Sequence, residues 1–263
     1  MAGGASSAPV SEPRSLKLSG VNPGNYRITP EDNIGSGTRG QKIDRNLAAI
    51  RLVKKLTQEK RYPTKEEQSV LAKYVGWGGL KNVFDKASTK PQDIRAREEL
   101  EQLLTKEEML EAFLSVTNAH YTSPEIISSI YDVLRHFGFN GGNVLEPTYG
   151  VGSFIGMMPE DMAASSKWYG SELDPITAKI GQLLYPDSQL LESGFQVAEF
   201  PFGKYDLAIG NPPFGDTRIA DTNKNRAAIN RFKIHNYVIA KEAMHLKPGG
   251  ILANVVTTRF LDT

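Results

Sequence analysis

The chain has 263 residues, 40% of them hydrophobic, and its 31 Lys and Arg balance 30 Asp and Glu to a formal net charge of +1. This is the composition of an ordinary globular protein, and the length allows one or two domains. The lack of Cys excludes disulfides, Cys-ligated metals and a Cys nucleophile. The His residues lack metal-ligand spacing, no apolar run is long enough for a membrane helix, and the N-terminus has no signal-peptide core. We therefore expect a cytoplasmic protein with no metal and no membrane partner.

The first part of the chain is predicted to be helical after a flexible start. Residues 1–40 are rich in Gly, Ser, Pro and Asn without periodicity, which predicts a flexible lead-in. Residues 41–117 form a predicted helical N-terminal module. Its first helix, over 42–62, has a basic face that either is solvated or contacts phosphates. A capping box at Thr64 predicts the next helix, and a third helical region covers 92–117.

The remainder, 118–263, alternates between strands and helices, which predicts an α/β domain with a mostly parallel sheet and helices on both faces. Ser123 begins a helix that ends near Gly138. The predicted strands are 143–146, 168–172, 205–209 and 251–256, and the later helices are 153–164, 175–184 and 235–246.

A glycine-containing turn follows the first strand, at Gly150 and Gly152. Glycines at this place allow a tight turn and close approach of the backbone to a ligand, although the same pattern also occurs in purely structural βα turns. Glu172 ends the next strand, where a carboxylate can accept hydrogen bonds from ribose hydroxyls or can simply be solvated. Glu146 stands before the glycines. A carboxylate there repels a pyrophosphate and suits an ammonium or sulfonium, which indicates S-adenosylmethionine as the cofactor.

The tetrapeptide Asn211, Pro212, Pro213 and Phe214 directly follows the strand 205–209. The prolines fix the backbone and remove donors, so the Asn211 side-chain oxygen and the Pro212 carbonyl can both accept from a planar amino group. Phe214 offers a face on which a base can stack. Accepting both amino hydrogens makes that nitrogen nucleophilic toward a sulfonium methyl. In isolation the tetrapeptide could be a Pro-rich turn, but its place after the cofactor motifs favours catalysis.

In this order the motifs resemble those of adenine-N6 DNA methyltransferases of the gamma group, with their NPPF motif. The resemblance implies a Rossmann-like class I S-adenosylmethionine-dependent methyltransferase sheet. It implies catalytic roles for Asn211, Pro212, Pro213 and Phe214. It also implies that the cofactor is bound by Tyr121, Thr122, Glu146, Pro147, Gly150, Gly152, Glu172, Phe195 and Asn211. Gly194 replaces the acidic residue that the family usually has before this Phe.

The N-terminal half is similar to modules of large methylase–helicase fusion proteins of phages and mobile elements. The similarity lies in 46–50, 64–68 and the segment 74–80 around Trp77. Because such methyltransferases have further strands, the sheet is expected to be truncated after strand 5. The resemblance implies C-terminal target-recognition and helicase-like regions in a longer polypeptide, a bacterial or phage-infected host cell, and a role in restriction–modification.

A long polar loop, 215–235, follows the tetrapeptide and is rich in basic residues, which suits phosphate contacts and the clamping of an extruded base. We therefore expect DNA as the partner. The candidate DNA-binding residues are Arg218, Lys224, Arg226, Arg231 and Lys233. His235 could flank the target or serve only in packing.

Three functions remain open at this stage. The first is transfer of a methyl group to adenine N6 in DNA, with the base flipped into the NPPF site. The second keeps the chemistry but acts on RNA bases or on protein glutamine. The third is a non-catalytic scaffold that binds the cofactor or DNA.

Overall fold

The computed structural model describes residues 12–118, 122–221 and 228–257. Its central feature is a sheet of five parallel strands in the order β3-β2-β1-β4-β5. The strands are β1 (Asn143–Glu146), β2 (Lys167–Glu172), β3 (Gln189–Glu192), β4 (Tyr205–Gly210) and β5 (Leu246–Asn254). The α helices are α1 (Arg39–Glu59), α2 (Lys65–Ala72), α3 (Pro91–Leu103), α4 (Lys106–Asn118), α5 (Pro124–His136), α6 (Ser153–Met157), α7 (Glu160–Ala163), α8 (Pro175–Leu184) and α9 (Ile234–His245).

The strand order is that of a doubly wound α/β fold, so the predicted fold class is confirmed. The order reverses between β1 and β4, and in such sheets ligands bind in the crevice outside the carboxyl ends of the strands at this switch point. Register pairs Val144 of β1 with Trp168 of β2 on one side and with Leu207 of β4 on the other. The segments that end β1, β2 and β4 are therefore neighbours at one edge of the sheet.

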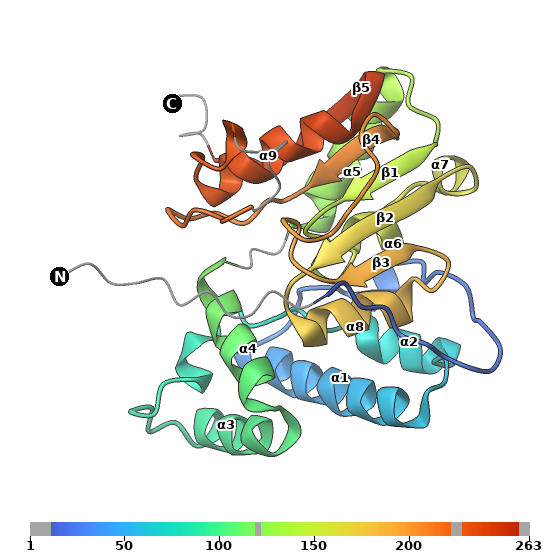
Figure 1. Ribbon diagram of the computed structural model, residues 1–263. Coiled ribbons are helices and arrows are strands. Elements are labelled where there is room, and N and C mark those ends of the chain that lie inside the picture. The colour runs from blue at the N-terminus through green and yellow to red at the C-terminus, as the bar shows by residue number, and fades with distance from the viewer. Residues whose placement is uncertain (1–11, 119–121, 222–227, 258–263) are drawn as a thin grey trace.

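Helices cover both faces of the sheet (Figure 1). On one face, apolar residues of β1, β2 and β4 pack with α5, α6 and α8 in the larger buried cluster. On the other face, Leu145 of β1 packs with Tyr205 of β4 and with Tyr237 and Val238 of α9 in a second cluster. Because alternate residues of a strand face opposite sides, the two clusters use alternating positions of β1.

A turn around Trp77 stabilises the helical part. Trp77 is fully buried, and its ring packs edge-on against the Phe84 ring with 5.4 Å between the ring centroids. Gly76 has φ +69°, a conformation that glycine adopts without strain. The buried Asn46 of α1 holds the turn at two points. Its Nδ2 donates to the Gly76 carbonyl at 2.6 Å and its Oδ1 accepts from the Val75 amide at 3.0 Å. Trp77 therefore packs under a glycine turn.

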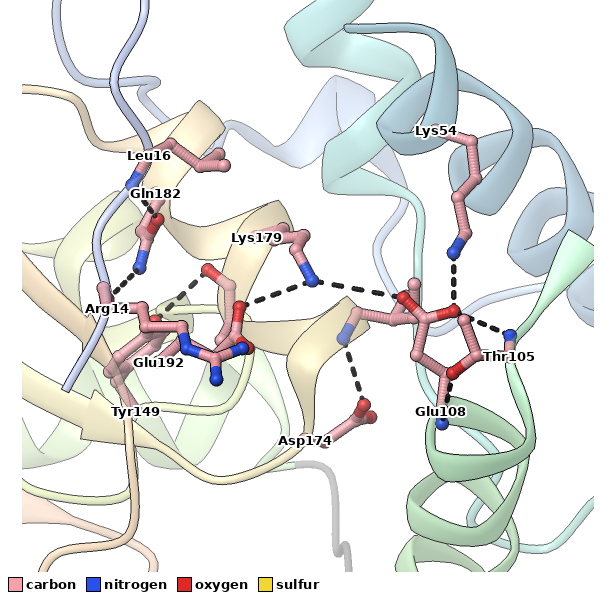
Figure 2. A network of polar contacts seen from close by, with 12 residues as sticks. Arg14, Leu16, Lys54, Thr105, Glu108, Tyr149, Asp174, Lys179, Gln182 and Glu192 are labelled. Carbon is pink, nitrogen blue, oxygen red and sulfur yellow. Dashed lines mark hydrogen bonds and ion pairs between the residues drawn. The ribbon is translucent and has the colours of Figure 1, made fainter. Parts of the chain in front are cut away.

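The helical part and the sheet share one core, because the larger buried cluster runs from Ile43 of α1 to Ile209 of β4. A partly buried charge network crosses the junction (Figure 2). Lys179 of α8 lies 3.2 Å from a carboxylate oxygen of Glu192 in β3 and 3.9 Å from one of Glu108 in α4. Glu108 also pairs with Lys54 of α1. The predicted limits of 41–117 and 118–263 therefore mark a change of composition within continuous packing.

Residues 12–38, within the predicted flexible lead-in, make ordered contacts with the rest of the protein. Their backbone is hydrogen-bonded to the α/β part: the Tyr26 amide donates to the Leu184 carbonyl at 2.8 Å and the Ile28 amide to the Gly156 carbonyl at 3.0 Å. Leu16 and Tyr26 pack against the larger cluster. Sequence periodicity missed this segment because it is irregular, yet it finds its hydrogen bonds on other elements. Residues 1–11 lie outside the described residues.

Several predicted elements differ in their limits. A capping box at Thr105, with the Glu108 amide donating to its hydroxyl at 3.2 Å, divides the region 92–117 into α3 and α4. Pro159 divides 153–164 into α6 and α7. The last strand begins at Leu246 rather than 251, and β3 was not predicted.

Candidate functional site

The glycine turn after β1 lies at the switch point of the sheet. Gly150 and Gly152 have φ of +56° and +75°, so both use the left-handed conformation. A Cβ on Gly152 would lie 2.4 Å from the Tyr185 ring, whereas a Cβ on Gly150 would meet nothing within 4 Å. Gly152 is thus required by packing, and Gly150 borders open space at the carboxyl end of β1.

Glu172, at the end of β2, is hydrogen-bonded to this turn. Its two carboxylate oxygens accept from the Gly150 amide at 3.0 Å and from the Asp174 amide at 2.9 Å. Asp174 in turn caps α8, since its Oδ1 accepts from the Ile176 amide at 3.0 Å. Partial burial raises the pKa of Glu172 to about 7, although these backbone hydrogen bonds lower it. Each oxygen keeps a second lone pair with which to accept from a ligand hydroxyl.

Glu146, at the end of β1, is only 2% exposed. Its Oε2 has no hydrogen-bond partner in the described part of the chain. Burial raises the pKa of Glu146 well above its usual range, and the nearby carboxyls of Glu242 and Glu172 raise it further. A buried acceptor beside a glycine turn is suited to a ligand that brings a cationic donor.

Asn211 and Thr122 bring two predicted motifs together. The Asn211 Nδ2 donates to the Thr122 hydroxyl at 3.1 Å, and Thr122 is only 8% exposed. Asn211 follows β4 directly, and Thr122 precedes α5, whose first residue is Pro124. The amide nitrogen is therefore turned to Thr122, which orients the acceptor oxygen Oδ1 away from that hydroxyl. The other residue predicted for this segment, Tyr121, lies outside the described residues.

Phe214, the last residue of the tetrapeptide, stacks on His235. The Phe214 ring lies 4.9 Å from the His235 ring at an interplanar angle of 24°. Burial lowers the pKa of His235, while hydrogen bonds to the Pro212 and Pro213 carbonyls raise it. His235 therefore has the packing role that the sequence left open, and it covers one face of Phe214 beside the proline carbonyls.

Two other predicted cofactor residues are held by the protein itself. The Pro147 carbonyl accepts from the Ser171 hydroxyl at 2.8 Å, which joins β1 to β2. Phe195 is 4% exposed, in the cluster beneath α9, and the Lys241 Nζ lies 4.2 Å from its ring centroid. The Phe195 ring thus packs against Lys241 of α9, and its role in cofactor binding stays a prediction.

The loop after the tetrapeptide is anchored to α9 through Asp221. The Tyr237 hydroxyl donates to Asp221 Oδ2 at 2.5 Å, and the Lys241 Nζ lies 3.9 Å from the same oxygen. The side chains of Lys241 and Asp221 are both fully buried. Lys241 also donates to the Phe195 carbonyl. One buried ammonium thus connects the start of this loop to the segment that follows β3.

The candidate DNA-binding residues of this loop differ in their surroundings. Arg218 and Arg231 are exposed, and Arg231 lies over the Phe232 ring at 5.4 Å. Lys233 is exposed but forms an ion pair with Asp216 at 2.5 Å. Lys224 and Arg226 lie outside the described residues. The described cations thus stand on both arms of the loop, which are joined by the bridge between Arg218 and Lys233.

Part of the basic face predicted for the first helix is paired within the protein. Arg51 of α1 pairs with Glu99 of α3, and Lys54 pairs with Glu108 of α4. Arg61, just after α1, lies 2.6 Å from Glu67. These pairs join α1 to its neighbours.

Sequence reasoning missed residues on α9 and β5. Glu242 is fully buried, and its Oε2 accepts from the Asn254 Nδ2 at 2.5 Å. A Lys-Glu pair in a helix is typical of a solvated face, so nothing in the sequence marked Lys241 and Glu242 as buried. Within the described ranges, no group of three or more His, Asp or Glu is arranged to hold a metal ion. None of the helices described is both long and apolar enough to cross a membrane.

Comparison with curated proteins finds distant relatives, two of which are described here, and no protein-family model matches the chain. Defense against restriction protein B of Escherichia phage P1 is 26% identical over 139 residues, which are 52% of this chain and 6% of that protein. Modification methylase CviBIII of Paramecium bursaria Chlorella virus NC1A is 28% identical over 160 residues, 60% of this chain and 41% of that protein. The matched part thus spans less than half of either relative.

Among solved structures, the chain is similar to the type I restriction-modification system methyltransferase subunit from Streptococcus thermophilus. The identity is 14% and the TM-score 0.43, and the match covers 80% of this chain and 55% of that one. The assignment of the fold therefore rests on the strand order of this chain itself.

Proposed function

We propose that this chain is the catalytic part of an S-adenosylmethionine-dependent methyltransferase that methylates the N6 amino group of adenine in DNA. The observation that carries the proposal is the placement of Asn211. It follows β4 at the switch point, one strand from the glycine turn, and its amide is oriented by Thr122. A nucleophile held by Asn211 would thus stand next to a ligand bound at the glycine turn.

The residues at the end of β1 and β2 fit this cofactor. Glu146 offers a buried oxygen that lacks a donor, which suits the cationic amino-acid part. Glu172 has both oxygens fixed by backbone amides, so it is preorganised to accept from the two hydroxyls of a ribose. Open space beside Gly150 allows the ligand to approach the backbone. The names of the relatives also support a methylase, since CviBIII is a modification methylase.

When bound, the cofactor supplies a methyl group on a sulfonium, whose loss leaves a neutral thioether. The part of Asn211 is to accept one amino hydrogen at Oδ1, and the part of the Pro212 carbonyl is to accept the other, which directs the nitrogen lone pair toward the methyl carbon. Formation of the N–C bond would break the S–C bond of the cofactor, and the proton left on nitrogen would pass to water. A strong base is not needed, because this proton leaves after the bond has formed.

DNA is proposed as the substrate because of the loop 215–235. Arg218 and Arg231 are exposed there, close in sequence to the tetrapeptide. Side chains of this kind bind phosphates, while a base extruded from the duplex enters the site. His235 now stacks on Phe214, so a flipped adenine would use the opposite ring face or replace the imidazole.

The test is transfer of a radiolabelled methyl group from the cofactor to duplex DNA, RNA or a glutamine peptide, followed by nucleoside analysis. We expect N6-methyladenine in DNA, and none with the Asn211→Ala variant. Label in RNA or peptide alone would assign the chemistry to another substrate. We include Arg95→Ala as a control, because Arg95 lies on α3 and pairs with Asp44.

A second candidate, a scaffold that binds cofactor or DNA without turnover, is favoured by one observation. His235 occupies a face of Phe214 and contacts the Pro212 carbonyl that the reaction requires. Cofactor binding without transfer to any of the three substrates would select it. We further propose, from the name of the phage P1 relative, that the whole protein acts in defence against restriction. The resemblance of the N-terminal half to methylase–helicase proteins is the ground for proposing target-recognition and helicase-like regions as its partners.

A further inference from the structure

Three buried side-chain oxygens at the carboxyl edge of the sheet have no hydrogen-bond partner within the described ranges. They are Glu146 Oε2, Glu242 Oε1 and Asn254 Oδ1. Glu146 ends β1, Asn254 ends β5, and Glu242 lies on α9, which packs against β4 and β5. Glu242 and Asn254 are joined to each other by the 2.5 Å hydrogen bond from the Asn254 amide.

Gly210 marks the place where these side chains meet. A Cβ on Gly210 would lie 3.7 Å from the Glu146 Cγ and 3.8 Å from the Asn254 Oδ1. Gly210 and Asn254 are register partners in β4 and β5. Glu146 and Asn254 therefore both lie beside Gly210, and Glu242 is joined to them through its hydrogen bond with Asn254. Asn211 is the next residue along the chain.

The chemistry of the three atoms specifies the missing partner. When the two carboxyl groups are ionised, all three atoms are acceptors, so the complementary group carries several N–H donors and a positive charge. Lys241, although next to Glu242 in α9, does not supply it. Its ammonium is directed to the Phe195 carbonyl and to Asp221. A primary ammonium on a bound ligand has the required three donors.

We propose that Glu242 and Asn254 complete, with Glu146, a receptor for the primary ammonium group of an amino-acid-bearing ligand. The inference rests on the proposed function, in which that ammonium belongs to the methionine part of S-adenosylmethionine. It adds two residues from α9 and β5 to a site that the sequence placed on β1, β2 and the segment after β4. It also explains why a helix buries a glutamate against the sheet.

This receptor makes ligand binding depend on pH. Burial raises the pKa of Glu242 to about 8, opposed by its hydrogen bond with Asn254. Burial and the carboxyls of Glu242 and Glu172 raise the pKa of Glu146. The phenols of Tyr131 and Tyr185 also interact electrostatically with Glu146. Glu242 therefore holds a proton in the free protein near neutral pH, and the pKa of Glu146 is shifted in the same direction. An ammonium binds better to the ionised pair, so its binding releases protons and tightens as pH rises.

The experiment compares two ligands that share the adenosine and thioether groups. S-adenosylhomocysteine carries the amino-acid part, and 5′-methylthioadenosine lacks it. Each is titrated calorimetrically into the wild type, Glu242→Gln and Asn254→Ala. Glu199→Gln serves as the charge-matched control, because Glu199 is exposed. We expect Glu242→Gln and Asn254→Ala each to weaken the binding of S-adenosylhomocysteine by roughly tenfold, the usual loss for a hydrogen bond to a charged group. The affinity for 5′-methylthioadenosine should stay unchanged.

Titration in two buffers of different ionisation enthalpy measures the protons released. We expect release on binding of S-adenosylhomocysteine to the wild type and less with Glu242→Gln. Unchanged affinity and proton release in Glu242→Gln would overturn the inference, as would equal weakening of both ligands, which indicates a structural effect. If the wild type binds neither ligand, the proposed function itself fails. Binding of 5′-methylthioadenosine as tight as that of S-adenosylhomocysteine would contradict the ammonium receptor alone.

Discussion

The amide of Asn211 donates to the hydroxyl of Thr122 at 3.1 Å, across 89 residues of sequence. This hydrogen bond joins the segment after β4 to the segment before α5. It fixes which end of the Asn211 amide is presented to a substrate, so it connects the fold directly to the proposed chemistry.

The coupling between these residues can be measured without any activity. We expect Thr122→Val and Asn211→Ala each to lower the free energy of unfolding by about 1 kcal/mol, the net worth of a typical hydrogen bond. Urea unfolding of both single variants and the double variant gives the coupling energy. Strict additivity of the two effects would show that the hydrogen bond contributes nothing.

The two glycines of the turn should differ in their tolerance. Gly152→Ala places a Cβ 2.4 Å from the Tyr185 ring, so we expect a loss of about 3 kcal/mol or more from overpacking and strain. The Cβ of Gly150→Ala meets no atom within 4 Å. The expected loss in the free energy of unfolding is therefore only that of a left-handed backbone at Ala, about 1–2 kcal/mol. Chemical denaturation of both variants checks the order, and the reverse order would contradict the packing described.

The stability of the free protein should fall as pH rises through neutrality. Burial raises the pKa of Glu242 in the folded state to about 8, above its ordinary value of 4.5 in the unfolded chain. Between these values the folded state binds more protons than the unfolded state, so the free energy of unfolding decreases with pH. Glu242→Gln removes this contribution. Melting temperatures from pH 5 to about 8.5 should decline less steeply in the variant, and identical slopes would contradict the burial of an ionisable Glu242.

DNA binding should depend on the exposed arginines of the loop 215–235. We expect Arg218→Ala and Arg231→Ala each to weaken binding to any DNA sequence and to reduce the salt dependence of the binding constant by about 0.9 in slope. Lys233→Ala should have a smaller effect because Lys233 is already paired with Asp216. Fluorescence titration with a labelled duplex at several salt concentrations measures both quantities. An equal loss with Arg95→Ala, on α3, would show that the effect is not local.

The sequence predicted the elements that carry strong local signals. β1, β2 and β4 are short apolar runs, and α8 begins with Pro175 after a capping Asp174, so their limits were correct to within a residue. The glycine turn and the tetrapeptide were placed correctly at the ends of these strands, because parallel strands bring such segments to one edge.

The features that sequence could not predict depend on tertiary contacts. β3 has four residues and is recognisable only by its pairing with β2. Residues 12–38 are held by hydrogen bonds to α6 and α8 rather than by their own periodicity. Burial of Glu242 requires the packing of α9 on β4 and β5, and no local pattern distinguishes it from a solvated helix position.

The central claim is that the glycine turn and Glu172 form a site for S-adenosylmethionine. Calorimetric titration of this chain with the cofactor, beside the Glu172→Ala variant, tests it most directly. The account predicts binding to the wild type and a loss of at least roughly tenfold in the variant, since two preorganised acceptors for ribose hydroxyls are removed. Absence of binding to the wild type, or equal affinity in the variant, would contradict it.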